Sequence, residues 1–289
     1  MSGAPWPDAG SPPSERAQLI RFFALTLIAW TVWGPQAAHR LGLLGWTVPP
    51  QSPLNLITVW APGLAAMGVA WRVARKQGVS DLWVRLRLWR VPAPWYVFAL
   101  CFEPLRWLLA LAIDRLTGQS YPLGGIPIVR ALGPAAAAMA PVALLLTLPN
   151  ALGEELGWRA FALPRLMRAR GPLVASVILG LFWGLWHVPM WIAFRSAEPS
   201  LLPIALLVAS MVPFTVLFTW LWLRTGGSLL LVCFFHASSA MKGYLLPKLP
   251  TLTEVAVLWI VAAAVSVVWL RRDDPTDPMV EIGDRRSTC

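Results

Sequence analysis

Long apolar segments constrain the fold of this chain more than any other feature of its sequence. Each has roughly 18 to 25 residues, enough for a helix to cross a hydrocarbon core of about 30 Å. The segments lie at about 18–38, 53–73, 93–113, 134–158, 172–194, 201–223, 227–247 and 252–270. Backbone polar groups in lipid must find partners within their own segment, which favours helices. The sequence therefore predicts an all-α, polytopic membrane bundle of about eight transmembrane helices.

Composition excludes a soluble protein. The chain is 57% hydrophobic and 13% charged, whereas soluble domains carry roughly a quarter charged residues. Its 18 tryptophans suit the headgroup level of a bilayer. We expect one helical membrane domain over 17–271, between a disordered tail at 1–16 and a polar tail at 272–289.

The net charge of +10 does not indicate nucleic-acid binding. Basic residues gather in short links between apolar segments, as in cytoplasmic loops. With an even number of spans, both termini are predicted to be cytoplasmic in a multi-pass protein of the plasma (inner) membrane. The expected partners are membrane lipid and a membrane-associated protein or peptide substrate. Cys101, Cys233 and Cys289 are scattered, which indicates neither a disulfide framework nor a zinc knuckle.

Ionisable residues within apolar segments are candidates for function. In "NALGEELGWRAFALPRL", Glu155 and Arg159 are four residues apart, so they are predicted to pair on one helix face. Glu154 points about 100° away, which leaves it outside that pair and favours a functional role. Glu103 and Arg106, three residues apart in the third segment, are expected to form a structural pair.

Two of the three histidines, His187 and His236, also fall inside apolar segments. Measured along their predicted helices, the depths of Glu154, His187 and His236 differ by up to about 15 Å. They converge only if a helix is tilted, broken or entered by a water-filled cavity. A buried glutamate is a usable general base, whereas one glutamate with two histidines also matches a catalytic zinc set. Both alternatives activate water, and the residues leave the choice between zinc and a metal-free mechanism open.

Other catalytic signatures are absent from the sequence. It contains no HExxH, no GxSxG, no P-loop and no dinucleotide-binding glycine motif. Ser238 and Ser239 follow His236 too closely to be its obvious partners in a serine protease.

Three ordered motifs resemble those of the CPBP family, which groups type II CAAX prenyl endopeptidases with Abi-like bacterial proteins of bacteriocin processing and self-immunity. "EELGWR", from Glu154 to Arg159, is similar to the EExxxR motif of that family. "WGLWH", from Trp183 to His187, is similar to its second motif, in which phenylalanine is usual where tryptophan stands here. "HASSA", from His236 to Ala240, is similar to the third motif except that Ala240 replaces an asparagine. The likeness covers about 145–245.

The resemblance implies a helical membrane endopeptidase with a cavity open to the cytoplasm. Glu154 would activate water, His187 would help to position it, and His236 would stabilise the oxyanion. Glu155 and Arg159 would hold the helix. The family is often labelled metalloprotease, so Glu154, His187 and His236 are also the candidate metal ligands.

Ala240 opens further alternatives, because losing one oxyanion donor can cost roughly 10² to 10³ in rate. Ala240 marks a weaker enzyme, a protein in which a neighbour such as Ser239 or Asn150 supplies the donor, or a protein that no longer cleaves. A non-catalytic scaffold or a bacteriocin self-immunity protein on the same fold is the main rival. A transporter would favour broken helices in two related halves, a symmetry that the sequence does not show.

Overall fold

A computed structural model of the chain describes residues 13–119, 138–194, 201–245 and 252–271, and within these ranges it contains helices and no strand. The first part holds α1 (Glu15–Thr26), η1 (Leu27–Ala29), α2 (Trp30–Arg40), α3 (Leu54–Trp83), η2 (Val84–Arg87) and α4 (Ala93–Leu116). The second holds α6 (Ala140–Glu155), a π-helix η5 (Leu156–Ala162), α7 (Leu163–Arg170) and α8 (Pro172–Phe194). The third holds α9 (Leu201–Arg224) and α10 (Leu229–Leu245), and the fourth holds α11 (Leu252–Arg271).

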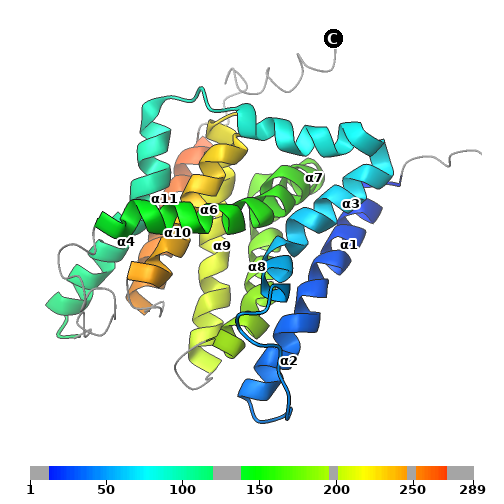
Figure 1. Cartoon of the computed structure of the whole chain (residues 1–289). Helices are drawn as coiled ribbons and strands as arrows, with labels where there is room; N and C mark the ends of the chain where they lie inside the picture. The colour runs from blue at the N-terminus through cyan, green and yellow to red at the C-terminus, as the bar shows by residue number, and fades with distance from the viewer. Residues whose placement is uncertain (1–12, 120–137, 195–200, 246–251, 272–289) are drawn as a thin grey trace, which may run out of the picture.

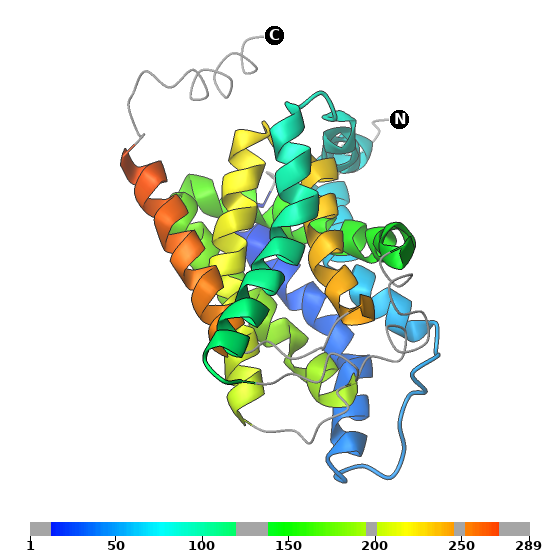
Figure 2. The same cartoon turned by 90° about the vertical axis from the view of Figure 1, so that its left-hand side faces the viewer.

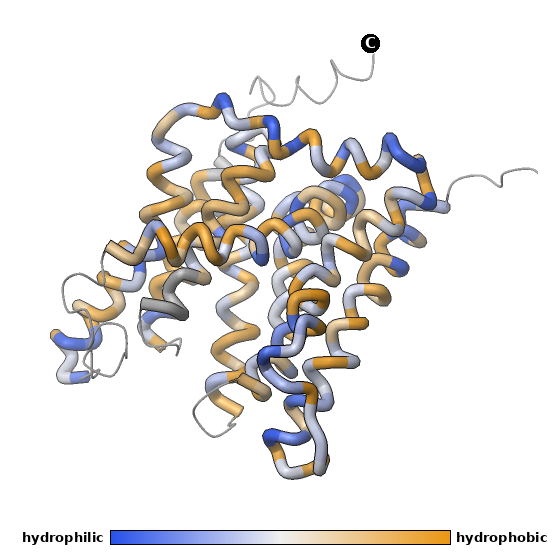
Figure 3. Tube along the Cα trace, viewed as in Figure 1, coloured by the Kyte–Doolittle hydropathy of each residue, from blue (hydrophilic) through white to orange (hydrophobic). Residues whose placement is uncertain are grey.

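Most of these helices form a bundle suited to a bilayer. Five helical stretches are long and apolar enough to cross a membrane: 15–40, 54–87, 93–116, 172–194 and 201–224. The apolar parts of α10 and α11 are shorter. The axes of helices α4, α8, α9, α10 and α11 are roughly parallel (Figures 1 and 2). Hydrophobic residues occur along most of each helix (Figure 3). The predicted all-α membrane bundle is therefore confirmed as the fold class.

The fourth apolar segment, predicted at 134–158, differs from the expected span. Its first residues lie outside the described part of the chain, and α6 begins at Ala140. Helix α6 lies across the bundle in Figure 1 and is seen nearly end-on in Figure 2. It does not run alongside α8 and α10, so its C-terminal end reaches the middle of these helices. This crossing removes the difference in depth that the sequence predicted between the glutamate and the two histidines.

Close glycine contacts hold α6 against α3. A Cβ atom added at Gly63 would lie 2.5 Å from the carbonyl oxygen of Gly153, and one added at Gly157 would lie 2.5 Å from the carbonyl carbon of Pro62. No larger residue fits without moving backbone, as at other close helix crossings in membranes. Gly157 is therefore glycine because the α3 backbone passes there, whereas a Cβ atom at Gly153 would lie 2.8 Å from the ring of Trp60.

The segment after the π-helix is anchored to the start of the chain. Arg165 on α7 donates from Nε to Oε1 of Gln18 on α1 at 3.0 Å. Burial, together with the neighbouring charge of Arg168, lowers the pKa of Arg165 to about 10, which leaves it charged at neutral pH. Gly171, at φ +72°, then ends α7 in a conformation that favours glycine, and α8 starts at the following proline.

Candidate active site

Glu154 lies at the C-terminal end of α6, where its side chain is buried in the bundle. Its Oε2 accepts a hydrogen bond from the indole Nε1 of Trp183 at 2.7 Å and a longer one from Nε1 of Trp158 at 3.3 Å. No arginine or lysine of the described residues forms an ion pair with this carboxylate at 4.0 Å or less. Two neutral donors therefore hold the carboxylate without cancelling its charge.

The structure brings both histidines to the same carboxylate. Nε2 of His187, on α8, is 3.8 Å from Oε2 of Glu154. Nε2 of His236, on α10, is 3.9 Å from the other oxygen, Oε1. The three side chains that the sequence singled out thus come from three helices and meet at one point.

The Nδ1 atoms of His187 and His236 make the hydrogen bonds that fix the orientation of each imidazole. Nδ1 of His187 lies 2.9 Å from the carbonyl oxygen of Trp183, which can only accept, so Nδ1 carries the proton in that bond. Nδ1 of His236 lies 2.7 Å from Oε1 of Glu155 and donates to this carboxylate. Both bonds leave Nε2 directed at Glu154.

Glu155 connects this histidine to a fully buried arginine. Nη1 of Arg159 lies 2.8 Å from Oε1 of Glu155, and both side chains are 0% exposed. The guanidinium also lies 4.3 Å from the ring centre of Trp183 and 3.7 Å from that of Phe218. A single carboxylate oxygen thus serves both Arg159 and His236, so the ion pair also orients a ring of the site.

The π-helix starts directly after the two glutamates. Residues of the π-helix, including Trp158 and Arg159, are buried without exception. Isolated π-helical turns are uncommon and often occur at functional sites. Here the wider turn lies where Gly157 packs against Pro62. Residues four apart still contact each other, because Trp158 donates to Glu154 and Arg159 donates to Glu155.

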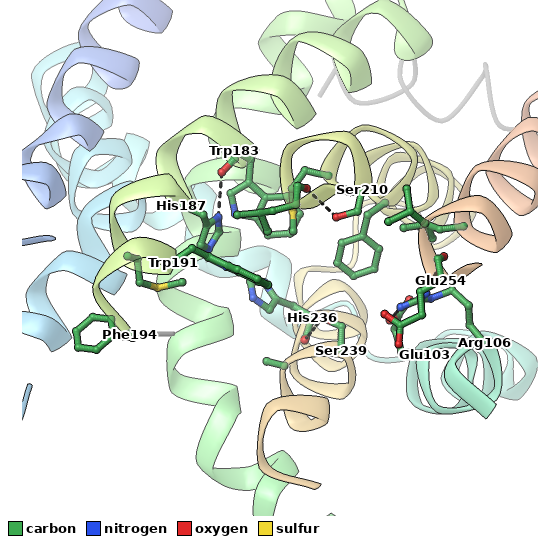
Figure 4. A pocket seen from close by; sticks show the side chains of 17 residues that line it. Glu103, Arg106, Trp183, His187, Trp191, Phe194, Ser210, His236, Ser239 and Glu254 are labelled. Atoms are coloured by element: carbon green, nitrogen blue, oxygen red, sulfur yellow. Dashed lines mark hydrogen bonds and ion pairs between the residues drawn. The ribbon is translucent and has the colours of Figure 1, made fainter. Parts of the chain in front are cut away.

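A cavity of about 410 Å³ opens beside the two histidines (Figure 4). Most of its wall is apolar and comes from α8, α9 and α11. The lining side chains are Glu103, Arg106, Trp183, His187, Met190, Trp191, Phe194, Leu207, Ser210, Met211, Phe214, His236, Ser239, Ala240, Glu254, Val255 and Leu258. An elongated apolar group can therefore reach the histidines through this space.

Glu103 and Arg106 form a second charged group on the opposite wall of the cavity (Figure 4). Arg106 binds both carboxylate oxygens of Glu103, through Nε at 3.0 Å and Nη2 at 2.7 Å. Its Nη1 donates to the backbone oxygen of Glu254 at 3.1 Å, which links α4 to α11. This fork joins two helices and matches the structural pair that the spacing predicted.

Ala240 lies on the cavity wall one turn after His236 and carries no hydrogen-bond donor there. Of the two candidate replacements, Ser239 lines the same wall, with its hydroxyl donating to the carbonyl oxygen of His236 at 2.8 Å. Asn150 does not line the cavity. Ser238 faces another way and donates to the carbonyl oxygen of Ala99 at 2.8 Å.

The zinc alternative concerns Glu154, His187 and His236. Within the described ranges, no group of three or more histidine, cysteine, aspartate and glutamate side chains is placed to hold a metal ion. The two imidazoles approach different oxygens of Glu154. Zinc binding by Glu154, His187 and His236 stays a prediction, as does the metal-free alternative.

Sequence reasoning missed the two indole donors to Glu154. The spacing from Glu154 to Trp158 is the helical i, i+4 spacing, so this contact could have been inferred from sequence. The shorter bond, from Trp183, joins residues 29 positions apart and had no local signal. The bond from His236 to Glu155 is likewise a long-range contact.

Comparison with known proteins shows what the segment with these motifs is similar to. Residues 136–242 match the family described as type II CAAX prenyl endopeptidase Rce1-like. The CAAX prenyl protease 2 of Methanococcus maripaludis is 32% identical over 132 residues, which cover 43% of this chain and 48% of the relative. The match thus spans about half the length of this curated relative. The segment that holds Glu154, His187 and His236 lies within the matched residues, so this part of the membrane protein is similar to the type II CAAX prenyl endopeptidases.

Proposed function

We propose that the protein is an intramembrane endopeptidase of the CAAX type. The observation that carries this proposal is the buried carboxylate of Glu154, which two imidazoles approach at 3.8 and 3.9 Å beside a cavity. A carboxylate with no cationic partner, next to two rings, is suited to move protons during hydrolysis.

The first step uses a water molecule held by Glu154 and His187. A water about 2.8 Å from both Oε2 of Glu154 and Nε2 of His187 fits beside the line that joins these atoms. Glu154 takes one proton from this water, and the oxygen forms a bond to the carbonyl carbon of the peptide. The electron pair of the carbonyl bond moves to its oxygen, which becomes the oxyanion.

His236 stabilises that oxyanion. Because its ring lies against the carboxylates of Glu154 and Glu155, it can hold protons on both nitrogens, with Nε2–H directed at the reacting group. When the tetrahedral intermediate collapses, the C–N bond breaks and Glu154 gives its proton to the leaving nitrogen. Arg159 keeps Glu155 charged and in place, so it acts through His236 without touching the substrate.

The proposed substrates are membrane-associated or C-terminally lipidated proteins and peptides. Two observations support this class: the name of the similar Methanococcus maripaludis protein, and the predominantly apolar wall of the cavity. An apolar chain of a lipidated substrate would lie along α9 and α11 while its peptide bond reaches Glu154.

We also propose a multi-pass topology in the plasma membrane with both termini in the cytoplasm. The support is the gathering of arginine in the links that follow the first spans, including Arg85, Arg87 and Arg90.

The test compares the purified wild type with Glu154→Gln on membrane-anchored peptides, each prepared with and without a C-terminal prenyl group. We expect the wild type to cleave the prenylated peptides and the variant to leave them intact, since glutamine cannot take the proton. Added chelator should leave the wild-type rate unchanged. Activity that a chelator abolishes and a metal ion restores would contradict the metal-free mechanism but not the proteolysis.

A non-catalytic scaffold or self-immunity protein is a second candidate, which Ala240 favours. In that case a well-folded wild type would bind the peptides without cleaving them, and Glu154→Gln would leave binding and the cellular role unchanged. The two candidates therefore predict opposite effects of the same substitution.

A further inference from the structure

A second cavity lies between α1 and α3. Its residues are far in the sequence from those of the candidate active site. Its volume is about 540 Å³, and it is lined by Pro13, Arg21, Trp71, Arg72 and Arg75. Three arginines and one tryptophan thus line one space, and no acidic residue is among the lining residues. None of these residues lines the cavity of the candidate active site.

The three arginines have no counter-ion within the part of the chain that the structure describes. All three are exposed, and no carboxylate of a described residue lies within 4.0 Å of Arg21, Arg72 or Arg75. Arg168 on α7, by contrast, is paired with Glu15 on α1. Like charges that line one cavity repel each other, and a bound anion would convert this repulsion into attraction. Guanidinium groups are well matched to phosphate because they donate two parallel hydrogen bonds.

The position along the helices matches the headgroup level of a bilayer. From Leu54 to Trp71, α3 runs through a long apolar stretch of about 27 Å, roughly the thickness of a hydrocarbon core. Trp71 is 43% exposed at the end of this stretch, as expected for an indole at the membrane interface. Arg21, on α1, lines the same cavity as Trp71, so it lies at the same end of this apolar stretch.

The backbone of α3 bends at this cavity. Arg75 has φ +50°, a conformation that is uncommon for residues other than glycine, and Ala74 is also non-helical. A Cβ atom at Gly78 would lie 2.5 Å from the carbonyl oxygen of Ala70, so the chain folds back tightly after the bend. Beyond it, α3 runs across the end of the bundle in Figure 1, and hydrophilic residues gather at the bend in Figure 3. The bend places Arg75 on the same cavity as Arg72.

We propose that Arg21, Arg72 and Arg75 form a binding site for the phosphate of an anionic phospholipid, with Trp71 against the upper acyl region. The site holds the bend of α3 and the start of α1 at the membrane surface. It is independent of the proposed proteolysis, since a scaffold on the same fold would keep it.

The experiment measures lipid binding to the full chain in a zwitterionic detergent by native mass spectrometry. Phosphatidylglycerol, phosphatidylcholine and inorganic phosphate are titrated separately. The test variant carries Arg21→Gln, Arg72→Gln and Arg75→Gln. The control carries Arg16→Gln, Arg87→Gln and Arg170→Gln, three exposed arginines that do not line this cavity. Both variants lose the same charge.

We expect the wild type and the control to bind phosphatidylglycerol alike, and the test variant to bind it roughly a hundredfold more weakly. Phosphatidylcholine should bind weakly to all three proteins. Equal binding by the test variant and the wild type, or equal losses in both variants, would overturn the site. Inorganic phosphate that binds as tightly as the lipid and displaces it would overturn the lipid assignment. If the triple variant does not fold, Arg72→Gln alone should weaken binding about fivefold, and an unchanged affinity would reject the proposal.

Discussion

Glu103 and Glu154 are both buried glutamates, yet their partners differ: Glu103 lines the cavity, whereas Glu154 lies behind His187 and His236, which line it. Glu103 is held at both oxygens by the guanidinium of Arg106. Glu154 accepts from two indole N–H groups and has two imidazoles at nearly 4 Å. A carboxylate in a bidentate ion pair is fixed and neutralised, whereas one held by neutral donors keeps its charge for a reaction. In this protein, the partners of a buried carboxylate therefore indicate whether its role is structural or chemical.

The substitution with the largest expected effect is Glu154→Gln. Glutamine keeps the size of the side chain but removes the proton acceptor, and general base catalysis contributes typically 10² to 10⁴ in rate. We expect cleavage of prenylated peptides to fall by about 10⁴-fold with little change in thermal stability. Initial rates and unfolding curves of the purified protein measure both quantities.

Glu103→Gln is the matched control on the other side of the cavity. It removes the charge that Arg106 holds, so we expect lower stability and a rate within a few-fold of the wild type. If Glu103→Gln abolished cleavage in a folded protein while Glu154→Gln did not, the two roles would have to be exchanged.

Glu155→Gln should have the next largest effect, on stability. The substitution leaves the buried charge of Arg159 without its partner, and breaking a buried ion pair in this way costs about 3–5 kcal/mol. It also weakens the acceptor for Nδ1 of His236, so activity should fall as well. Reversible unfolding in mixed micelles measures the free energy. A loss below about 1 kcal/mol would show that the aromatic faces of Trp183 and Phe218 suffice to hold the guanidinium.

Much of the bundle could be predicted from hydrophobic length alone. The predicted segment 93–113 corresponds to α4 at Ala93–Leu116, and 172–194 coincides with α8 at Pro172–Phe194. The direction of α6 could not be predicted, because an apolar helix buried against other helices and one that crosses lipid have the same composition. Gly153 and Gly157 hinted at close packing, but which helix approaches them is a long-range property.

The site was predictable as a set of residues but not as a geometry. Glu154, His187 and His236 stand out because ionisable groups are rare in apolar segments. Their spacing suggested incompatible depths, which only the crossing of α6 resolves. The proposed roles of these residues remain predictions, since no pattern in the sequence shows which ring nitrogen faces the carboxylate.

Ala240→Asn tests whether the missing donor limits the rate. Ala240 lies on the cavity wall beside His236, so an asparagine there can direct its amide at the oxyanion. One oxyanion donor is worth roughly 10² to 10³ in rate, and we expect a gain of that order in kcat. Ser239→Ala is the companion variant, because the Ser239 hydroxyl is an alternative donor on the same cavity wall. A large loss in Ser239→Ala, with no gain in Ala240→Asn, would show that the serine already fills the role.

Trp183→Phe should lower the rate less than Glu154→Gln does, and it tests most directly what holds Glu154. Phenylalanine keeps an aromatic ring against His187 and Arg159 but removes the N–H that donates to Glu154 at 2.7 Å. A hydrogen bond to a charged group contributes about 1.5–3 kcal/mol, so we expect kcat to fall roughly 10- to 100-fold while KM changes little. Trp158→Phe removes the longer bond, at 3.3 Å, and should lower kcat less. Equal effects of the two substitutions, or a change confined to KM, would mean that ring packing positions the carboxylate. In that case neutral donors would no longer explain how Glu154 stays charged beside the cavity without an arginine of its own.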